Sequence, residues 1–253
     1  MSLPLSVEDR LAVCTWSLQP ETPEALLAHL KAIGITKAQI ALDPLRENPA
    51  IWGRYGDLCR ESGISQVSGM MVTVGEDYST MEAIKETGGV VPDSTWPENL
   101  ANFKENILVA KDLGLKLITF HAGFLPHEPS DPAFAKLMNR IRQIGELFGE
   151  NEMDLGFETG QETAETLKDF LDQLALPNVG VNFDPANMIL YDKGDPIEAL
   201  KVLAPYLKQC HIKDATRTVE AGQWGEEVQS GTGQVDWKDF FATLNQLQYT
   251  GNF

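Results

Sequence analysis

Val179-Gly-Val-Asn-Phe-Asp184 is an apolar run that ends in a carboxylate, and three other runs share this pattern. They are Leu117-Ile-Thr-Phe-His121, Met153-Asp-Leu-Gly-Phe-Glu158 and Leu207-Lys-Gln-Cys-His211. Short continuous apolar runs are typical of strands buried on both faces of a parallel sheet. Because parallel strands end at the same edge of a sheet, we expect the four terminal side chains to converge there. Polar residues repeated at this position indicate an active site.

Strand-like and helix-like segments alternate along the chain, which predicts βα units around a parallel sheet. In the first unit, Thr22 is suited to cap a helix with Pro23 in its first position, and Gly34 is suited to end it. Strands are expected over 11–16, 37–42, 65–72, 116–121, 153–158, 179–184 and 207–212. Helices are expected over 22–33, 50–61, 97–113, 131–148, 161–174, 196–203 and 236–247.

The length of 253 residues is typical of one α/β barrel, so residues 1–253 are expected to form a single domain. The predicted fold is an α/β (β/α)8 TIM barrel. The chain stops at Tyr249-Thr-Gly-Asn-Phe253, where the eighth strand should begin, so that strand is expected to be truncated. An incomplete barrel has two parallel edges, which a loop or another chain must cover. Association as a homodimer is one way to do so.

Composition excludes several classes of function. A net charge of −17 repels polyanions, so no nucleic-acid partner is expected. No apolar stretch approaches the roughly 20 residues that a membrane-spanning helix needs, and the first ten residues lack a secretory signal. The protein is therefore expected to be cytoplasmic. Cys14, Cys59 and Cys210 are interpreted as small core residues rather than as a disulfide framework.

Two long insertions, 75–96 and 215–235, follow strand ends and are expected to form walls or lids over the site. The second contains Gly231-Thr-Gly233, which is weak evidence for phosphate binding because a tight turn explains it equally well. His29 and His127 are interpreted as structural or exposed residues.

Glu158, Asp184 and His211 are separated by 26 and 27 positions, about one βα unit each, so they should lie on adjacent strands. Two carboxylates and one imidazole suit a divalent metal ion such as Mn²⁺, Co²⁺, Mg²⁺ or Zn²⁺. The alternative for each carboxylate is a structural one. Asp184, directly before Pro185, is also well placed to cap a helix.

The chain resembles the xylose isomerase-like TIM-barrel family of sugar and sugar-phosphate isomerases and epimerases over nearly its whole length. The resemblance rests on Phe120-His-Ala-Gly123, Gly156-Phe-Glu-Thr159, Asn182-Phe-Asp-Pro-Ala-Asn187, His211-Ile-Lys-Asp214 and Gly231-Thr-Gly-Gln-Val-Asp-Trp237. It implies that Glu158, Asp184 and His211 are three of four metal ligands. It also implies that His121, Asn187 and Lys213 line the substrate pocket. The family's fourth ligand, a Glu on strand eight, is absent here; Glu128, Glu226 and Glu227 are loop alternatives that the sequence does not separate.

The resemblance therefore implies a metal-dependent isomerase or epimerase of a sugar, sugar phosphate or related hydroxy-carbonyl compound, acting through an enediolate. Glu158 is the candidate base, and Lys213 either stabilises the oxyanion or pairs with a substrate phosphate or carboxylate. The alternative interpretation of Lys213 is an ordinary exposed lysine. His121 is expected to hydrogen-bond substrate. Trp16 is expected either to stack on a sugar or to belong to the core.

Two other functions remain open from the sequence, namely an inosose-type dehydratase and a catalytically incomplete sugar-binding barrel. The fold family also contains apurinic endonucleases with three zinc ions. That activity is disfavoured, because the chain has only four histidines and carries Asn187 where the nuclease pattern has a ligand histidine. The acidic net charge also disfavours DNA as a substrate.

Overall fold

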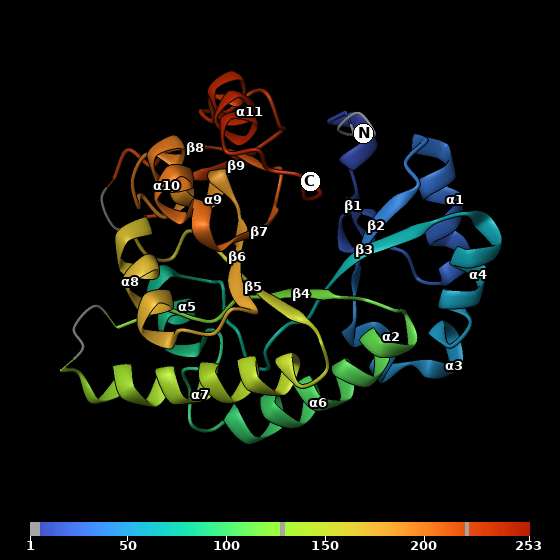
Figure 1. The fold of residues 1–253 in the computed structure, drawn as a ribbon, viewed down its shortest axis with the longest axis horizontal. Coiled ribbons are helices and arrows are strands. Elements are labelled where there is room, and N and C mark those ends of the chain that lie inside the picture. The colour runs from blue at the N-terminus through green and yellow to red at the C-terminus, as the bar shows by residue number, and fades with distance from the viewer. Residues whose placement is uncertain (1–5, 127–129, 221–222) are drawn as a thin grey trace.

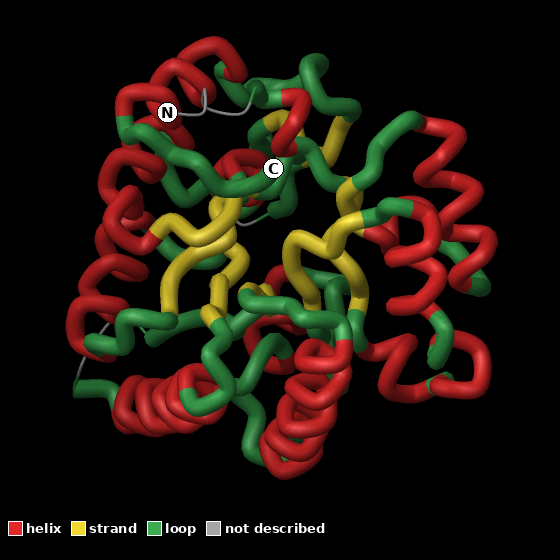
Figure 2. The backbone as a smooth tube through the Cα atoms, turned by 45° about the vertical axis from the view of Figure 1, so that its right-hand side comes forward, coloured by secondary structure: helices red, strands yellow, loops and turns green. Residues whose placement is uncertain are grey.

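The computed structural model describes residues 6–126, 130–220 and 223–253. Seven parallel strands follow one another in sequence order and curl into part of a barrel, with helices around the outside (Figure 1, Figure 2). The strands are β1 (Val13–Cys14), β2 (Lys37–Ala41), β3 (Ser65–Met70), β4 (Leu117–Phe120), β5 (Asp154–Glu158), β6 (Val179–Phe183) and β7 (Leu207–Cys210). The predicted α/β barrel architecture is thus confirmed.

The helices begin and end where local chemistry favours it. In α1 (Pro23–Ile33), the Thr22 hydroxyl accepts a hydrogen bond from the Ala25 N–H, and Gly34 ends the helix at a φ of 75°. The other helices are α2 (Asp43–Glu47), α3 (Pro49–Trp52), α4 (Tyr55–Ser62), α5 (Met81–Thr87), α6 (Trp96–Asp112), α7 (Pro132–Gly149), α8 (Ala164–Leu174), α9 (Pro185–Leu190), α10 (Pro196–Leu203) and α11 (Trp237–Gln246). Among them, α7 and α8 run as predicted to within a few residues.

The helix predicted over 50–61 is wrong as one continuous element. The chain forms α3 and α4, which are separated at Gly53 and Arg54, where Arg54 adopts φ −94° and ψ 1°. Glycine stabilises a helix poorly, so an apolar pattern that spans it does not guarantee continuity. The short helices α2 and α9, which each begin at a strand end with Pro in the first turn, were not expected. Strand β1 is also shorter than predicted, because the chain turns into a 3₁₀ helix at Thr15–Leu18.

The last two residues lie between the two edge strands of the sheet. The Phe253 carbonyl accepts a hydrogen bond from the Ala12 N–H at 2.7 Å, and the Phe253 N–H donates to the Arg10 carbonyl at 3.0 Å. On the other side, the Cys210 N–H donates to the Asn252 carbonyl at 3.4 Å. The Arg10 guanidinium lies 4.6 Å from the centre of the Phe253 ring. Residues 252–253 therefore occupy the place predicted for the start of an eighth strand.

None of the described helices combines the length and the apolar character needed to cross a membrane.

Buried aromatic rings join the sheet to its outer helices. Phe120, at the end of β4, packs edge-on against Phe103 of α6 at 5.5 Å and against Phe157 of β5 at 5.6 Å between ring centres. All three side chains are buried in the main core. Since Phe120 immediately precedes His121, this packing also fixes the strand end that delivers His121 to the rim.

The Phe120→Ala variant is expected to lose about 3–5 kcal/mol of unfolding free energy, because it removes a buried ring and leaves a cavity. Urea denaturation followed by far-UV circular dichroism measures this loss. Leu108→Ala on α6 is the control, since Leu108 is 63% exposed and its truncation should change the free energy little. Equal effects of the two substitutions would contradict the assigned core.

Candidate metal centre

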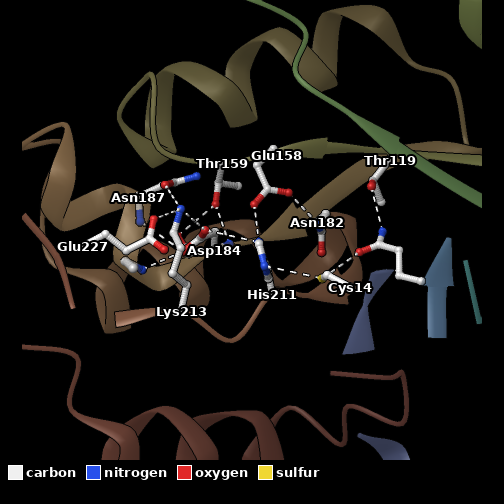
Figure 3. A network of polar contacts seen from close by, with 12 residues as sticks. Cys14, Thr119, Glu158, Thr159, Asn182, Asp184, Asn187, His211, Lys213 and Glu227 are labelled. Atoms are coloured by element: carbon white, nitrogen blue, oxygen red, sulfur yellow. Dashed lines mark hydrogen bonds and ion pairs between the residues drawn. The ribbon is translucent and has the colours of Figure 1, made fainter. Parts of the chain in front are cut away.

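Glu158, Asp184 and His211 converge at the carboxyl edge of the sheet. Glu158 is the last residue of β5, Asp184 directly follows β6, and His211 directly follows β7. One ligand atom of each lies within 4.8 Å of those of the other two. His211 Nδ1 lies 2.8 Å from Glu158 Oε1 and 3.4 Å from Asp184 Oδ2 (Figure 3). Of the four strand-end side chains predicted to converge, these three form the cluster.

The two oxygens of Asp184 serve different purposes. Oδ1 accepts hydrogen bonds from the N–H groups of Ala186 at 2.8 Å and Asn187 at 3.0 Å, so it caps α9. Oδ2 faces His211 and lies 3.1 Å from the Lys213 ammonium. The cap interpretation is therefore confirmed for one oxygen, while the other oxygen faces the cluster.

Attraction between opposite charges in this cluster offsets the cost of burying them. Burial by itself lowers the pKa of His211, but Glu158 and Asp184 outweigh it and raise that pKa well above its ordinary value. Burial likewise disfavours the Asp184 carboxylate, yet Lys213 and His211 hold its pKa below the ordinary range. The pKa of Lys213 is raised, because the attraction of Asp184, Glu158 and Glu227 exceeds the effect of its burial. Two buried carboxylates thus require neighbouring positive charge.

The donor set fits a divalent metal ion. Glu158 and Asp184 are 8% and 0% exposed, and they offer hard oxygen ligands beside an imidazole nitrogen. Among the described residues, Asp184 Oδ2 receives no hydrogen bond of acceptable geometry. This buried oxygen faces the ligand atoms of Glu158 and His211 and pairs with the Lys213 ammonium at 3.1 Å, so its surroundings already favour positive charge.

Asn182 orients the Glu158 carboxylate, and Thr159 holds the backbone of Asp184. The Asn182 Nδ2 group donates to Glu158 Oε2 at 2.5 Å, which orients the carboxylate so that Oε1 faces His211. The Thr159 hydroxyl accepts a hydrogen bond from the Asp184 N–H at 2.8 Å. Sequence reasoning did not single out these two residues, although both stand within the quoted motifs.

The second ring nitrogen of His211 contacts Cys14. His211 Nε2 lies 3.7 Å from Cys14 Sγ, which lies 3.5 Å from Gln39 Oε1, and Gln39 Nε2 donates to Thr119 Oγ1 at 2.9 Å (Figure 3). If the Cys14 thiol donates to Gln39, its sulfur is left to accept the Nε2–H of His211. The prediction of Cys14 as a core residue is wrong, because Cys14 is only partly buried and contacts the site. Cys59 and Cys210 are buried, as predicted.

The Cys14→Ala variant is expected to bind Mn²⁺ about tenfold more weakly, because His211 loses the acceptor that orients its ring. The Cys14→Ser variant keeps an acceptor and should recover most of the affinity. Calorimetric titration of the metal-free protein provides the measurement, and Cys59→Ala, a buried cysteine on α4, serves as the control. Unchanged affinity in Cys14→Ala would remove Cys14 from any role at the site.

A cavity of about 800 Å³ opens above the cluster. Glu158 and His211 line its base, together with Trp16, His121, Asn187 and Lys213, the four residues predicted to bind substrate. The side chain of Asp184 is fully buried behind them. Nδ1 of His121 is buried and has no hydrogen-bond partner among the described residues, and the described metal-ligand cluster does not include His121. These positions agree with a substrate-facing role for His121.

Both predicted insertions contribute walls. The first supplies Tyr78, whose ring packs edge-on against His121 at 6.4 Å between centres. The second folds into a hairpin of β8 (Asp214–Thr216) and β9 (Glu226–Val228) and supplies Trp224 and Glu227. Tyr191, which follows α9, packs against Trp224 at 4.9 Å. Sequence reasoning missed these three aromatic residues, because nothing in a loop sequence shows which side chains face inward.

Of the three loop glutamates considered as alternative metal ligands, the hairpin contains Glu226 and Glu227. Glu227 lines the cavity, and its Oε2 lies 3.6 Å from the Lys213 ammonium. Glu226 is the adjacent residue of β9 and is not among the residues that line this cavity. Glu128 lies outside the described residues. The structure therefore brings Glu227 to the pocket.

Asp214 organises the loop that carries this hairpin back to α11. Its buried carboxylate accepts hydrogen bonds from the N–H groups of Gly231 at 2.8 Å, Gly233 at 3.0 Å and Val235 at 3.1 Å. The Trp237 indole N–H donates to it at 3.1 Å. A Cβ atom on Gly233 would lie 2.2 Å from Asp214 Oδ1, so the glycine is required for this approach. The Gly231-Thr-Gly233 segment therefore encloses the chain's own carboxylate.

Glu162 is buried between β5 and α8, where its Oε1 accepts the Leu125 N–H at 2.5 Å. Burial raises the pKa of Glu162 to about 8. The folded protein therefore holds a proton on this carboxyl over a pH range in which the unfolded chain has lost it. The favourable contribution of the protonated Glu162 carboxyl to the free energy of unfolding is full at acidic pH and is lost as the pH rises towards 8.

The Glu162→Gln variant should gain stability relative to the parent by roughly a few kcal/mol between pH 5 and pH 8.5, because its amide needs no proton. Urea unfolding across this pH range measures the difference. Glu165→Gln, at an exposed position of α8, should show no such trend. A pH-independent difference between Glu162→Gln and the parent would be inconsistent with a neutral buried carboxyl.

Comparisons with known proteins agree with this architecture. The sequence profile of the family described as xylose isomerase-like TIM barrel matches residues 27–253. The uncharacterized protein YihM of Escherichia coli (strain K12) is 28% identical over 151 residues, which are 58% of this chain and 46% of YihM. The match thus spans about half the length of that relative.

Solved structures share the fold over almost the whole chain. A xylose isomerase domain protein from Planctomyces limnophilus has a TM-score of 0.87 at 30% identity, covering 96% of this chain and 89% of that one. A xylose isomerase-like TIM barrel protein from Mycobacterium smegmatis, in complex with magnesium, has a TM-score of 0.73 at 17% identity, covering 98% and 90%.

Enzymes of two reaction types are also among the similar structures. The 3-keto-D-glucoside 4-epimerase YcjR from E. coli has a TM-score of 0.72 at 16% identity, covering 96% of this chain and 89% of its own. The probable 3-DHS dehydratase AsbF from Bacillus anthracis has a TM-score of 0.71 at 16% identity, covering 94% and 89%. At these identities the similarity shows a common fold.

Proposed function

Because this chain belongs to the xylose isomerase-like TIM barrel family, we propose that it is a divalent-metal-dependent isomerase or epimerase of a sugar or related hydroxy-carbonyl compound. The observation that carries the proposal is the cluster of Glu158, Asp184 and His211 at the base of a cavity large enough for a sugar. Epimerases with this fold support the reaction class.

Glu158, Asp184 and His211 would hold an ion of Mn, Co, Mg or Zn through one ligand atom each. When bound, such an ion supplies Lewis acidity, which polarises a substrate carbonyl and stabilises negative charge on its oxygen. Asn182 keeps the Glu158 carboxylate in a fixed orientation through its 2.5 Å hydrogen bond. The ligand geometry is thus held by residues that do not themselves face the cavity.

Proton transfer falls to the chain's own side chains. Glu158 removes the proton from the carbon next to the carbonyl, and the electron pair moves into an enediolate. The Lys213 ammonium lies at the cavity wall and stabilises the developing oxyanion. His121 lines the cavity and hydrogen-bonds a substrate hydroxyl. Return of the proton to the neighbouring carbon, with transfer of a hydroxyl proton between the two oxygens, gives an isomer. An epimer requires protonation of the same carbon on its opposite face by a second acid, and Glu227 is the other carboxyl group of the described cavity lining.

A dehydratase is the second candidate, and the position of Glu227 favours it. Glu227 is a second carboxyl group on the cavity wall, beside Lys213. In its protonated form it would donate a proton to a hydroxyl that leaves from the β-carbon of the enediolate, with release of water. The dehydratase-type fold relative is consistent with this alternative.

The first test compares metal content and proton exchange in the parent and two site variants. About one divalent ion per chain is expected in the parent, and Glu158→Gln and His211→Ala should lose it. Exchange of a ketose C–H proton in D₂O, followed by NMR, should fall by about 10²–10⁴-fold in Glu158→Gln. Glu165→Gln and His29→Ala, at exposed positions of α8 and α1, are matched controls.

The outcomes separate the candidate functions. Metal binding without proton exchange for any ketose or inosose would leave a sugar-binding barrel. Loss of water from an inosose would select the dehydratase. A parent protein that takes up no divalent ion even when it is supplied in excess would overturn the proposal.

A further inference from the structure

We infer that the pocket takes an uncharged polyhydroxy carbonyl compound and discriminates against its phosphate esters. This inference rests on the proposed function and narrows its substrate class. Three features of the site carry it: the charges on the cavity wall, the occupied anion-binding backbone groups and the aromatic lining.

The cavity wall has little positive charge to offer to a phosphate group. Among the described residues that line it, Lys213 is the only lysine or arginine. Its ammonium already lies 3.1 Å from Asp184 Oδ2 and 3.6 Å from Glu227 Oε2, and it donates to Asn187 Oδ1 at 2.7 Å (Figure 3). Phosphate recognition in proteins relies on charged donors that are free to make several hydrogen bonds. Asp184 and Asn187 take two of the three donor hydrogens of the Lys213 ammonium, which leaves one for a substrate oxygen and not the several that a phosphate group needs.

A bound metal ion does not reverse this balance. The carboxylates of Glu158, Asp184 and Glu227 together carry three negative charges. A divalent ion and the Lys213 ammonium together carry three positive charges. The loaded site is therefore neutral overall, and it attracts a phosphate dianion no more than it attracts a neutral ligand.

The backbone groups that usually hold phosphate are filled by the chain's own carboxylates. The glycine-rich turn at Gly231 and Gly233 directs its N–H groups at Asp214, at 2.8 and 3.0 Å. The N-terminus of α9 directs its free N–H groups at Asp184 Oδ1. Helix N-termini and glycine-rich turns are the common phosphate sites of α/β proteins. Both are already occupied beside this pocket.

The remaining wall suits the two faces of a neutral sugar. Trp16, Tyr78, Tyr191 and Trp224 supply aromatic surface on which the C–H groups of a sugar can pack. Tyr191 and Trp224 form a corner, with an angle of 67° between their rings. Side chains such as Asn187 and Gln229 supply neutral hydrogen-bonding groups for hydroxyls. The lining thus recognises shape and hydroxyl groups without requiring ligand charge.

The test uses the full chain loaded with Mn²⁺ and a panel of the four D-ketohexoses, each paired with its 6-phosphate. Binding is measured by calorimetry and proton exchange in D₂O by NMR, both at constant ionic strength. At least one neutral ketose should bind, with an affinity at least about 100-fold above that of its own phosphate ester, because the phosphate dianion would lose its hydration in a neutral site that offers it few charged donors.

Charge variants test the assigned cause. Glu227→Lys should raise the affinity for the phosphate ester relative to the neutral ketose by about tenfold or more, because it converts a repelling wall group into an attracting one. Glu226→Lys makes the same change in net charge on the opposite face of β9 and should leave the ratio unchanged. Equal shifts in both variants would show that net charge, rather than the pocket wall, sets the ratio.

Two results would overturn the inference: a phosphate ester that binds as well as its neutral partner, or a panel in which no neutral ketose binds. Failure of the proposed reaction gives a different result. A neutral ketose that binds selectively but exchanges no proton would sustain the inference on ligand class and contradict the isomerase or epimerase activity.

Discussion

The structure depends on one electrostatic constraint, which is the burial of the Glu158 and Asp184 carboxylates around a single imidazole. Charge buried in a protein interior must be compensated or hydrogen-bonded. Here the compensation comes from His211, Lys213 and the N–H groups of α9, and it leaves Asp184 Oδ2 facing His211 and Lys213 close to Glu158. The same cluster that is costly to bury is well suited to a divalent cation. The ability of the site to hold a metal ion therefore follows from its electrostatics.

Carboxylates also shape the surroundings of the site. Asp214 collects N–H groups from Gly231, Gly233 and Val235, and so orders the segment that follows the hairpin bearing Glu227. Asp184 does the same for the first turn of α9, which leads to Tyr191. In both cases a buried carboxylate of the chain itself accepts the backbone N–H groups of the segment and so holds its conformation. The described lining of the resulting pocket consists largely of aromatic rings and includes one lysine. The inferred preference for neutral ligands therefore follows from the same contacts that order these loops.

Much of the barrel could be predicted from the sequence because its signals are local. Apolar runs gave β4 to β7 within a residue or two, and Thr22 with Gly34 gave the ends of α1. The break between α3 and α4 could not be predicted, because helical periodicity continues across Gly53 while the backbone does not. The cluster of Glu158, Asp184 and His211 was predictable for a topological reason: parallel neighbouring strands bring equivalent positions together whatever the loops do.

The amino-acid sequence by itself determined the strand order, the identity of the residues at the strand ends and hence the composition of the candidate metal site. Only the tertiary structure decided that Asp184 divides its oxygens between a helix cap and the site, and that Cys14 contacts His211 across 197 positions of sequence. It also decided that Glu227, rather than Glu226, faces the pocket. The physical reason is the sequence distance over which each interaction acts. Backbone geometry and strand direction follow from near neighbours, whereas side-chain contacts between distant segments depend on how the whole chain packs.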